Sequence, residues 1–382
     1  MHSNQRNQQR IEKDFNRTVI SLLGIPIDLA SYEDIVDEVN LACKENRRTC
    51  ISTPNLNFCL LAKKDNAFYN SLIQSDLVIA DGMPLLWISK VLKMSGVQKI
   101  SGSTLFEHLS QQQPSTKIKV FLFGGAPGIA EAAHHSLNSS PNVTGLMSTG
   151  YLNPGVGSAE ELSSKEILSQ INATNMDFLV VSLGAKKGQS WIIRNLQELN
   201  APVISHLGAV LAFTSGKITR APRLLQRLGL EWTWRIKEEP FLFRRYWNDG
   251  IGFCGLVFTK IIPYAFFLAH RKKSLRSTNV QLSFEIVNDQ NKDNILVKIK
   301  GQLTAATLAQ QRTAYCQLAM SSTVQLDMSG VDEVDEFGIG QILILFKYVS
   351  NNLSIVDAPD YLRTKFRYES LEFLFSPERI KL

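Results

Sequence analysis

Short apolar runs alternate with longer amphipathic segments along the first half of the chain, and this alternation constrains the fold more than any other feature. Each apolar run has the length of a buried strand, and each intervening segment has helical spacing. The expected strands are residues 18–25, 49–53, 76–80, 119–123, 177–183 and 201–207, and the expected helices are 31–46, 56–75, 103–113, 127–139, 158–173 and 188–199. This order predicts a Rossmann-like α/β fold with a largely parallel sheet covered on both faces.

Polar or glycine residues stand at or just beyond the ends of five of these expected strands. They are Thr53, Asn55, Asp81, Gly124, Gly125, Gly184 and Gly208. Ligands bind beyond the carboxyl ends of strands in open α/β sheets, so these residues predict a binding site on one rim. Glycines at such ends also let a phosphate approach the backbone N–H groups of a helix N-terminus. A simpler interpretation stays open for each residue, because Asp-Gly is a common turn pair and asparagine is a common N-cap.

Charge is unevenly distributed along the chain. Residues 217–276 hold 13 basic and 4 acidic side chains, a net charge of +9, whereas residues 1–216 are neutral and residues 277–382 carry −3. A local excess of this size indicates an anionic partner, which could be a membrane surface, a phosphate-rich ligand or nucleic acid. No nucleic-acid-binding motif or aromatic–basic alternation accompanies it, so we expect no nucleic-acid partner.

The segment 250–269 is apolar and close to the length of a membrane span. It could span a membrane, lie on a membrane surface beside its basic flank, or form a buried core helix followed by a charged linker. Lys260 and Pro263 interrupt the apolar run. This interruption favours the helix that lies on the surface.

Several other classes of protein find little support in the sequence. The five cysteines, Cys43, Cys50, Cys59, Cys254 and Cys316, form no Cys-x-x-Cys pair, which predicts reduced thiols in a cytosolic protein. No Asp-x-Asp stands near the expected site, so we expect neither a metal nor a cofactor. The absence of G-x-G-x-x-G disfavours a nucleotide-dependent oxidoreductase. Residues 1–17 are polar and lack the apolar core of a signal peptide, so we expect a mobile tail.

Several motifs resemble the WecG/TagA/CpsF family of glycosyltransferases. They are Thr53-Pro54-Asn55, Ala80-Asp81-Gly82, Ser101-Gly102-Ser103, FLFGGAPG at 121–128, and the stretch 215–240 with the Arg244-Arg245-Tyr246 that follows it. The resemblance covers roughly residues 18–250. It implies an inverting transferase that moves an N-acetylmannosamine-type or related sugar from UDP to a polyprenyl-diphosphate-linked sugar. Such enzymes assemble bacterial surface polysaccharides or exopolysaccharides at the inner face of the cell membrane.

The resemblance also implies roles for individual residues. Asp81 matches the proposed catalytic base, and Thr53 and Asn55 match a polar pair in the active site. Arg220, Arg235, Arg244 and Arg245 fall in the basic appendage that is thought to meet the diphosphate and the membrane. A carboxylate can take the proton of an acceptor hydroxyl, and arginine binds phosphate bidentately, so the residue types suit this chemistry.

Two positions depart from the family pattern. The family's glutamine after residue 183 falls on Gly188, and Gln189 is the candidate that would replace it in binding substrate. The family also tends to have arginine directly after Glu-Pro, whereas residues 241–243 are Phe-Leu-Phe here. This apolar triplet implies an altered contact with the acceptor or the membrane.

The C-terminal region predicts a small α/β module. Strand-like runs at 281–287, 294–300 and 323–328 precede a helix that begins near Gly338. The spacing of Asp327, Ser329-Gly330, Asp335 and Gly338 resembles a STAS domain over roughly residues 280–376. Glu336 follows Asp335 where phosphoregulated members carry serine, so the resemblance implies a docking module for another protein or a second copy.

Together these features predict four parts of the chain. They are a mobile tail (1–17), a transferase core (18–216), a basic appendage and linker (217–276) and a STAS-like domain (277–382). The leading hypothesis is a membrane-peripheral enzyme with a UDP-sugar donor and a lipid-linked acceptor. The alternative is a non-catalytic scaffold that binds partners through its C-terminal module. Thr53, Asn55 and Asp81 favour the enzyme.

Overall fold

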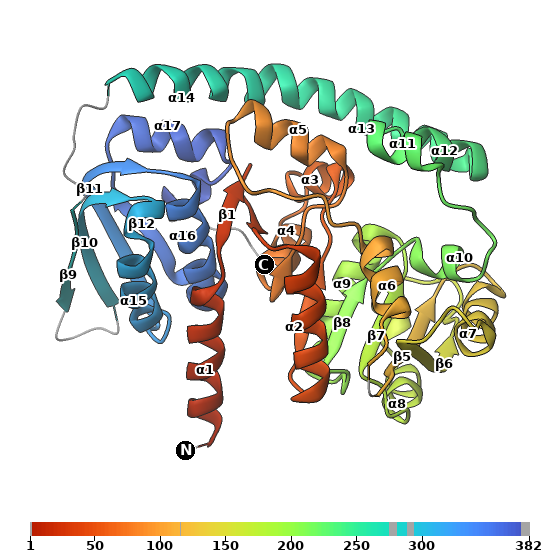
Figure 1. Cartoon of the computed structure of the whole chain (residues 1–382). Helices are drawn as coiled ribbons and strands as arrows, with labels where there is room; N and C mark the ends of the chain where they lie inside the picture. The colour runs from red at the N-terminus through yellow and green to blue at the C-terminus, as the bar shows by residue number, and fades with distance from the viewer. Residues whose placement is uncertain (1, 115, 275–280, 289–293, 376–382) are drawn as a thin grey trace.

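The computed structural model describes residues 2–114, 116–274, 281–288 and 294–375. Two α/β lobes lie side by side, and a long helix crosses both of them (Figure 1). The larger lobe contains a six-stranded sheet and the C-terminal lobe a separate four-stranded sheet. The predicted fold class is therefore confirmed.

The larger lobe has the predicted Rossmann-like sheet. Its strands are β3 (Thr49–Ser52), β4 (Leu77–Val78), β5 (Ile118–Gly124), β6 (Leu146–Leu152), β7 (Phe178–Ser182) and β8 (Val203–His206). Their order is β4-β3-β8-β7-β5-β6, and every neighbouring pair is parallel. Alternate residues of β5 enter different cores, with Val120 and Leu122 on one face and Phe121 and Phe123 on the other. Both faces are thus buried, as parallel sheets require.

Helices connect these strands and cover both faces of the sheet (Figure 1). They are α2 (Tyr32–Lys44), α3 (Leu56–Ala62), α4 (Asn66–Ile73), α5 (Met83–Val91), α6 (Gly102–Gln111), α7 (Ile129–Ser139), α8 (Lys165–Asn172), α9 (Ala185–Asn195) and α10 (Val210–Thr214). The single helix expected over 56–75 is broken, because Asp65 caps a new helix by accepting the Phe68 N–H.

The expected strand at 18–25 does not join the sheet. It folds into the antiparallel hairpin of β1 (Val19–Leu22) and β2 (Ile25–Asp28). Leu23 and Gly24 form the turn with φ values of 55° and 81°, and these left-handed conformations reverse the chain. The sequence also failed to predict β6, because this edge strand is only partly buried and contains Ser148, Thr149 and Gly150.

The N-terminal segment is not the mobile tail that we expected. Residues His2–Asn16 form helix α1. Ile11 and Phe15 lie one helical turn apart and are buried in the core of the C-terminal lobe. Composition was misleading because this helix has a narrow apolar stripe and is otherwise polar.

The C-terminal lobe contains β9 (Leu282–Asn288), β10 (Asn294–Leu303), β11 (Thr323–Val334) and β12 (Leu353–Asp357), in the order β12-β11-β10-β9. β9 and β10 are antiparallel, and the other pairs are parallel. Its helices are α15 (Leu308–Leu318), α16 (Glu336–Val349) and α17 (Asp360–Tyr368). Asp335 caps α16 by accepting the N–H groups of Phe337 and Gly338. The predicted α/β module is therefore present.

The two lobes are joined by the helices of the basic appendage. α11 (Arg223–Leu228) and α12 (Glu231–Glu238) precede α13 (Phe243–Leu256), a π-helical turn (Val257–Ile261) and α14 (Ile262–Ser274). Residues Pro240–Arg271 form a 32-residue helix that is long and apolar enough to cross a membrane by length and composition alone. We call this helix the strap. It runs over both lobes in Figure 1.

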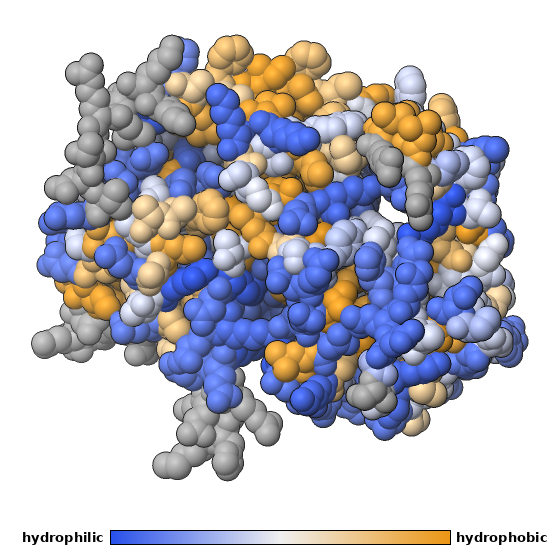
Figure 2. Space-filling view, in the orientation of Figure 1, coloured by the Kyte–Doolittle hydropathy of each residue, from blue (hydrophilic) through white to orange (hydrophobic). Residues whose placement is uncertain are grey.

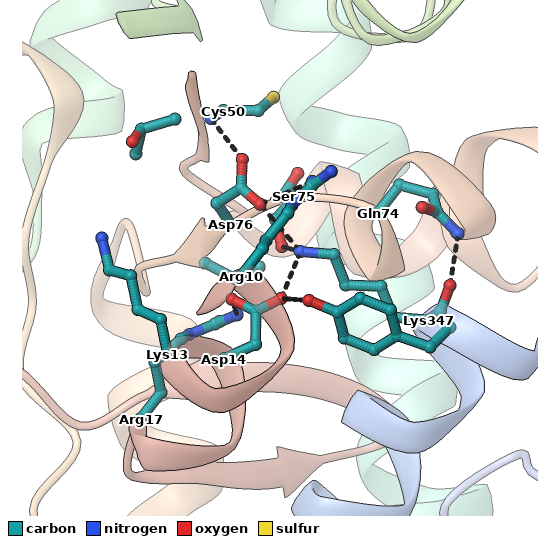
Figure 3. Close-up of polar contacts among 12 residues, drawn as sticks. Arg10, Lys13, Asp14, Arg17, Cys50, Gln74, Ser75, Asp76 and Lys347 are labelled. Atoms are coloured by element: carbon teal, nitrogen blue, oxygen red, sulfur yellow. Dashed lines mark hydrogen bonds and ion pairs between the residues drawn. The ribbon is translucent and has the colours of Figure 1, made fainter. Parts of the chain in front are cut away.

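A buried group of ion pairs holds the two lobes and α1 together (Figure 3). The Lys347 Nζ of α16 lies 2.7 Å from Asp14 Oδ2 of α1 and 2.8 Å from Asp76 Oδ1 of the larger lobe. Asp76 also accepts the Cys50 N–H of β3, 2.8 Å away. Burial alone would raise the pKa of Asp76, but Lys347 and Arg10 hold that pKa below its usual range.

We expect Lys347→Met to lower the free energy of unfolding by about 3 kcal/mol, because it removes the cation that Asp14 and Asp76 share and leaves these carboxylates only Arg17 and Arg10. Urea unfolding at pH 7 measures this difference. The exposed variant Lys165→Met is the control and should stay within about 0.5 kcal/mol of the wild type. Adding Asp14→Asn and Asp76→Asn should recover part of the loss, whereas an unchanged unfolding curve for Lys347→Met would contradict this account.

Candidate active site

The carboxyl ends of the parallel strands meet on one rim of the large sheet, as predicted. The Asp81 N–H donates to the Pro54 carbonyl at 2.8 Å, so the segments after β3 and β4 are adjacent. A methyl group at Gly102, in the first turn of α6, would come 3.5 Å from Thr53 Cγ2. Thr53, Asp81 and the start of α6 therefore converge. Asn55 stands beside them and caps α3 by accepting the Phe58 N–H at 3.3 Å.

Asp81 is the carboxylate at the centre of this group. Burial raises its pKa to about 7. Lys99 and the Gly102 N–H oppose this effect, and the charge of Glu231 adds to it. A carboxylate with a pKa near neutrality is half ionised at physiological pH, and it can accept a proton from a bound hydroxyl.

Three neighbours of Asp81 were not predicted from the sequence. Lys99 and Glu231 form an ion pair that connects the rim to α12 of the appendage. Tyr32 lies at the start of α2, where Thr104 and the Ser101 backbone hydrogen-bond its hydroxyl. Burial raises the pKa of Tyr32, so the hydroxyl keeps its proton. Two of these residues could have been predicted from their distance in sequence to a family motif, because Lys99 lies just before Ser101-Gly102 and Glu231 directly follows Gly229-Leu230.

The glycines at the rim have definite conformational roles. Gly124 has a φ of +100°, and a methyl group there would come 2.6 Å from the Ser182 carbonyl. That carbonyl accepts the Gly125 N–H at 2.8 Å, and the Ser182 hydroxyl donates to the Gly208 carbonyl at 2.9 Å. These contacts bring the ends of β5, β7 and β8 together.

Three helices begin at this rim without a side-chain cap. Gly82, Gly128 and Gly184 are the N-cap residues of α5, α7 and α9, and none of them supplies a capping side chain. The first N–H groups of such helices have no intrahelical partner. They form a ready binding surface for a phosphate or another anion.

The structure corrects the prediction for Gln189. Its side chain is fully buried, and its Nε2 donates to Ser52 Oγ at 3.0 Å inside the core. The helical period of α9 turns this position away from the rim, so Gln189 does not replace the family's glutamine. A methyl group at Gly188 would lie 2.1 Å from His206 Cδ2. His206 therefore occupies the space that a side chain at position 188 needs.

His206 is a buried neutral histidine. Burial lowers its pKa. Its Nε2 lies 2.6 Å from the Leu183 carbonyl, which can only accept, so Nε2 carries the hydrogen. Through this bond His206 connects the end of β8 to the loop that starts α9.

The four predicted arginines form two separate sets. Arg220 and Arg235 lie over the Phe213 ring, with guanidinium carbons 5.7 Å and 5.1 Å from the ring centre. Arg220 also pairs with Glu107 and donates to the Ser103 carbonyl at 2.6 Å, which places it beside the start of α6. Arg244 and Arg245 are on α13, where they line a groove of about 710 Å³ between α3 and the strap.

Among the residues that the structure describes, no group of three or more His, Cys, Asp or Glu side chains is arranged to hold a metal ion.

Comparison with known proteins identifies this chain, with its titratable carboxylate at the rim of a parallel sheet and its basic helical appendage, as a glycosyltransferase. It belongs to the glycosyl transferase WecG/TagA/CpsF family, whose model matches residues 20–265. Similar proteins occur in the Staphylococcus aureus strains NCTC 8325 / PS 47, COL and MSSA476. Each is named N-acetylglucosaminyldiphosphoundecaprenol N-acetyl-beta-D-mannosaminyltransferase. Each is 24% identical to this chain over 228 residues, which cover 59% of this chain and 87% of the relative.

We expect Asp81→Asn to be more stable than the wild type at pH 8. Folding raises the pKa of Asp81. The contribution of this group to the stability is therefore greatest below its ordinary pKa of 3.8 and falls as the pH rises to about 7. Asparagine removes this penalty, so the difference in Tm should grow from pH 4 to pH 7 and then level off. The exposed variant Asp37→Asn is the control and should show little difference at any pH. A Tm for Asp81→Asn that never exceeds that of the wild type would disprove the raised pKa.

We expect Gly188→Ala to destabilise the protein by about 1–3 kcal/mol, because the new methyl group overlaps the His206 ring. Adding His206→Ala should remove most of this cost, so the double variant should lose less than the sum of the single variants. Gly250→Ala is the control, since nothing lies within 4 Å of its Cβ position. Chemical denaturation of the four proteins measures the coupling, and strict additivity would contradict the overlap.

Proposed function

We propose that this glycosyltransferase moves a sugar of the N-acetylmannosamine type, or a related one, from a UDP-sugar to a polyprenyl-diphosphate-linked sugar. The names of the Staphylococcus aureus relatives support this substrate class. The reaction would serve bacterial surface-polysaccharide or exopolysaccharide assembly at the inner face of the cell membrane. The observation that carries the proposal is the position of Asp81, which lies on the rim with a pKa of about 7 and faces the basic appendage through Lys99 and Glu231.

In the proposed reaction Asp81 is the general base. It takes the proton of the acceptor hydroxyl while that oxygen forms a bond to the anomeric carbon of the donor sugar. The bond between this carbon and the UDP oxygen breaks on the opposite side, so the configuration is inverted. UDP leaves with the electron pair and gains negative charge, and it therefore needs donors and cations nearby. Thr53 and Asn55 lie beside Asp81, where they would orient the sugars.

The rim supplies groups that can receive the donor diphosphate. The uncapped starts of α5, α7 and α9 present backbone N–H groups, and Gly124, Gly125, Gly184 and Gly208 keep the approach free of side chains. Arg220 and Arg235 come from the appendage; Arg220 lies next to the start of α6, and Arg235 lies over the Phe213 ring. Arg244 and Arg245 are placed further along, in the groove below the strap, where the acceptor diphosphate and an anionic membrane surface would meet them. No cofactor takes part in this scheme.

The C-terminal lobe is proposed to be a STAS-like module. Its antiparallel β9–β10 pair, its parallel β11 and β12, and the Asp335 cap of α16 support this assignment. The outer side of α16 packs on the hairpin of its own chain, since a methyl group at Gly340 would meet the Val19 carbonyl at 2.2 Å. Docking of another protein or a second copy would therefore use a different surface of this lobe.

A non-catalytic scaffold is the alternative function. The observation that favours it is at position 188, where the resemblance places glutamine but this chain has glycine, and where the His206 ring leaves no room for a side chain. The two hypotheses differ in whether the protein releases UDP when both substrates are present.

We expect the purified full-length protein to transfer sugar from at least one member of a panel of UDP-sugars to a polyprenyl-diphosphate-linked amino sugar. UDP release and the mass of the lipid product measure the reaction. Asp81→Ala should lower the rate at least about 100-fold, because it removes the general base. The pH profile of kcat/KM for the wild type should rise to a plateau above pH 7, following the pKa of Asp81.

Asp37→Ala, which removes an exposed carboxylate from α2, is the control and should keep full activity. The absence of transfer from every donor would favour the scaffold. If the Asp81→Ala variant kept its activity, the protein would still be an enzyme, but Asp81 would not be its general base.

A further inference from the structure

The groove between α3 and the strap carries an unbalanced positive charge. Its basic lining residues are Lys63, Lys64, Arg244, Arg245 and Lys260, and Asp249 is its one acidic lining residue. The Asp249 carboxylate already accepts a hydrogen bond from Asn57 Nδ2 at 2.9 Å. A cavity of about 710 Å³ with this charge is suited to an anionic ligand.

The helix α3 and the strap run in the same direction along the groove, so the groove has one end at the N-terminal side of both helices and another at their C-terminal side. Asn57 bonds to Asp249, Leu60 packs against Gly252, and Lys63 lies within electrostatic range of Lys260. The arginine end, with Arg244 and Arg245, therefore adjoins the rim. The lysine end, with Lys63, Lys64 and Lys260, lies about 12 Å along α3 from Asn55, at ~1.5 Å per residue. Leu60, Leu61 and Leu256 form an apolar wall between the two ends.

The lysine end brings cations together without an acid in its lining. Burial and the charge of Lys260 lower the pKa of Lys63 to about 8. Lys260 is held in place by the Arg367 carbonyl, 3.1 Å away, and by the Ser370 hydroxyl. The carboxylates that act on Lys260, Glu369 and Glu372, are not among the groove-lining residues. Positive charges placed this way favour the binding of an anion from solution or from a lipid.

The outer face of the strap is a row of large apolar side chains. They are Phe243, Trp247, Ile251, Phe258, Ile262 and Phe266, at intervals of four or seven residues that keep them on one side of the helix. Phe258 is 70% exposed and Trp247 is 61% exposed. Figure 2 shows hydrophobic side chains gathered along this upper edge of the molecule. An exposed apolar row of this length beside basic residues is typical of a helix that lies in a membrane interface.

The inner face of the strap explains why this helix lies flat. Ile261 and Tyr264 are fully buried, and the Tyr264 ring stacks on Tyr368 of α17 with centroids 5.1 Å apart. Closer to the middle of the strap, Gly252 packs on Leu60 of α3. A strap that crossed the bilayer would have to leave both lobes and expose these contacts.

We propose that the lysine end of the groove binds the phosphate of an anionic phospholipid while the outer face of the strap rests in the same leaflet. We assign the diphosphate of the lipid acceptor to the arginine end, because that diphosphate is attached to the sugar that reacts at Asp81 and the arginine end adjoins the rim. The inference extends the membrane contact of the proposed function, and it does not depend on the transfer reaction.

Binding to vesicles tests the proposal with the full-length protein. Flotation is measured with phosphatidylcholine vesicles and with vesicles that contain about one third phosphatidylglycerol. The double variant Lys63→Glu/Lys64→Glu should bind the anionic vesicles at least about tenfold more weakly than the wild type. Lys117→Glu/Lys165→Glu is the matched control, because it makes the same charge change at exposed positions away from the strap. Its affinity should stay within about twofold of the wild type, and melting curves confirm that both variants are folded.

The apolar row has its own test. Phe258→Glu/Phe266→Glu should weaken binding to both kinds of vesicle, whereas Val156→Glu, at a fully exposed loop position, should not.

Wild-type affinity of the Lys63→Glu/Lys64→Glu variant for anionic vesicles would overturn the proposal. Equal competition by free glycerol 3-phosphate and by vesicles would assign the site to a soluble phosphate instead. Loss of transfer to a water-soluble acceptor analogue in the lysine variant would assign it to the acceptor diphosphate. Failure of the wild type to transfer sugar would leave the vesicle result unchanged.

Discussion

The buried ammonium of Lys347 is the constraint on which the arrangement of this molecule depends. It contacts Asp14 of α1 and Asp76 at the start of β4, and all three groups lie in the low-dielectric interior. Separating these groups would leave the buried Lys347 ammonium unpaired, so α1, the larger lobe and the C-terminal lobe stay together. Asp76 also stands five residues before Asp81. The C-terminal lobe therefore helps to fix the strand β4 that precedes the proposed base, and it is more than a tethered module.

The same arrangement gives the basic appendage a fixed position. The strap is held by α17 through Tyr264 and by α3 through Gly252, so its N-terminal end is placed beside the rim. Glu231 then reaches Lys99, and Arg220 reaches the Ser103 carbonyl at the start of α6. Without the C-terminal lobe, the strap would lose its contact with α17 and would be held only by the larger lobe. The added lobe thus contributes to the geometry of the site, although the rim residues identified in the described part of the chain all come from the larger lobe and the appendage.

Local patterns predicted the features that depend on local physics. Strand length and helical spacing predicted the parallel sheet, and from the parallel sheet we predicted that Thr53 lies near Asp81. The structure confirms both. The pattern could not predict contacts made at long range. Helix α1 was predicted to be a tail because its two buried apolar residues pack mainly against residues that lie more than 270 positions away in the sequence. Gln189 was misplaced because one position along a helix turns a side chain by about 100°. Glu231 becomes a neighbour of Asp81 only through the path of the appendage.

Burial and charge oppose one another at Asp81, and this balance connects the fold to the chemistry. Burial makes the carboxylate more basic, which helps it to take a proton, but it also lowers the fraction that is ionised. Lys99 favours the ionised form, and Glu231, which shares Lys99, limits that effect. The arrival of a UDP diphosphate would add negative charge and raise the pKa further unless cations enter with it. In the proposed mechanism Arg220 and Arg235 would offset part of that charge. Each is paired with a glutamate in this structure, Arg220 with Glu107 and Arg235 with Glu239, so the donor diphosphate would compete with these carboxylates.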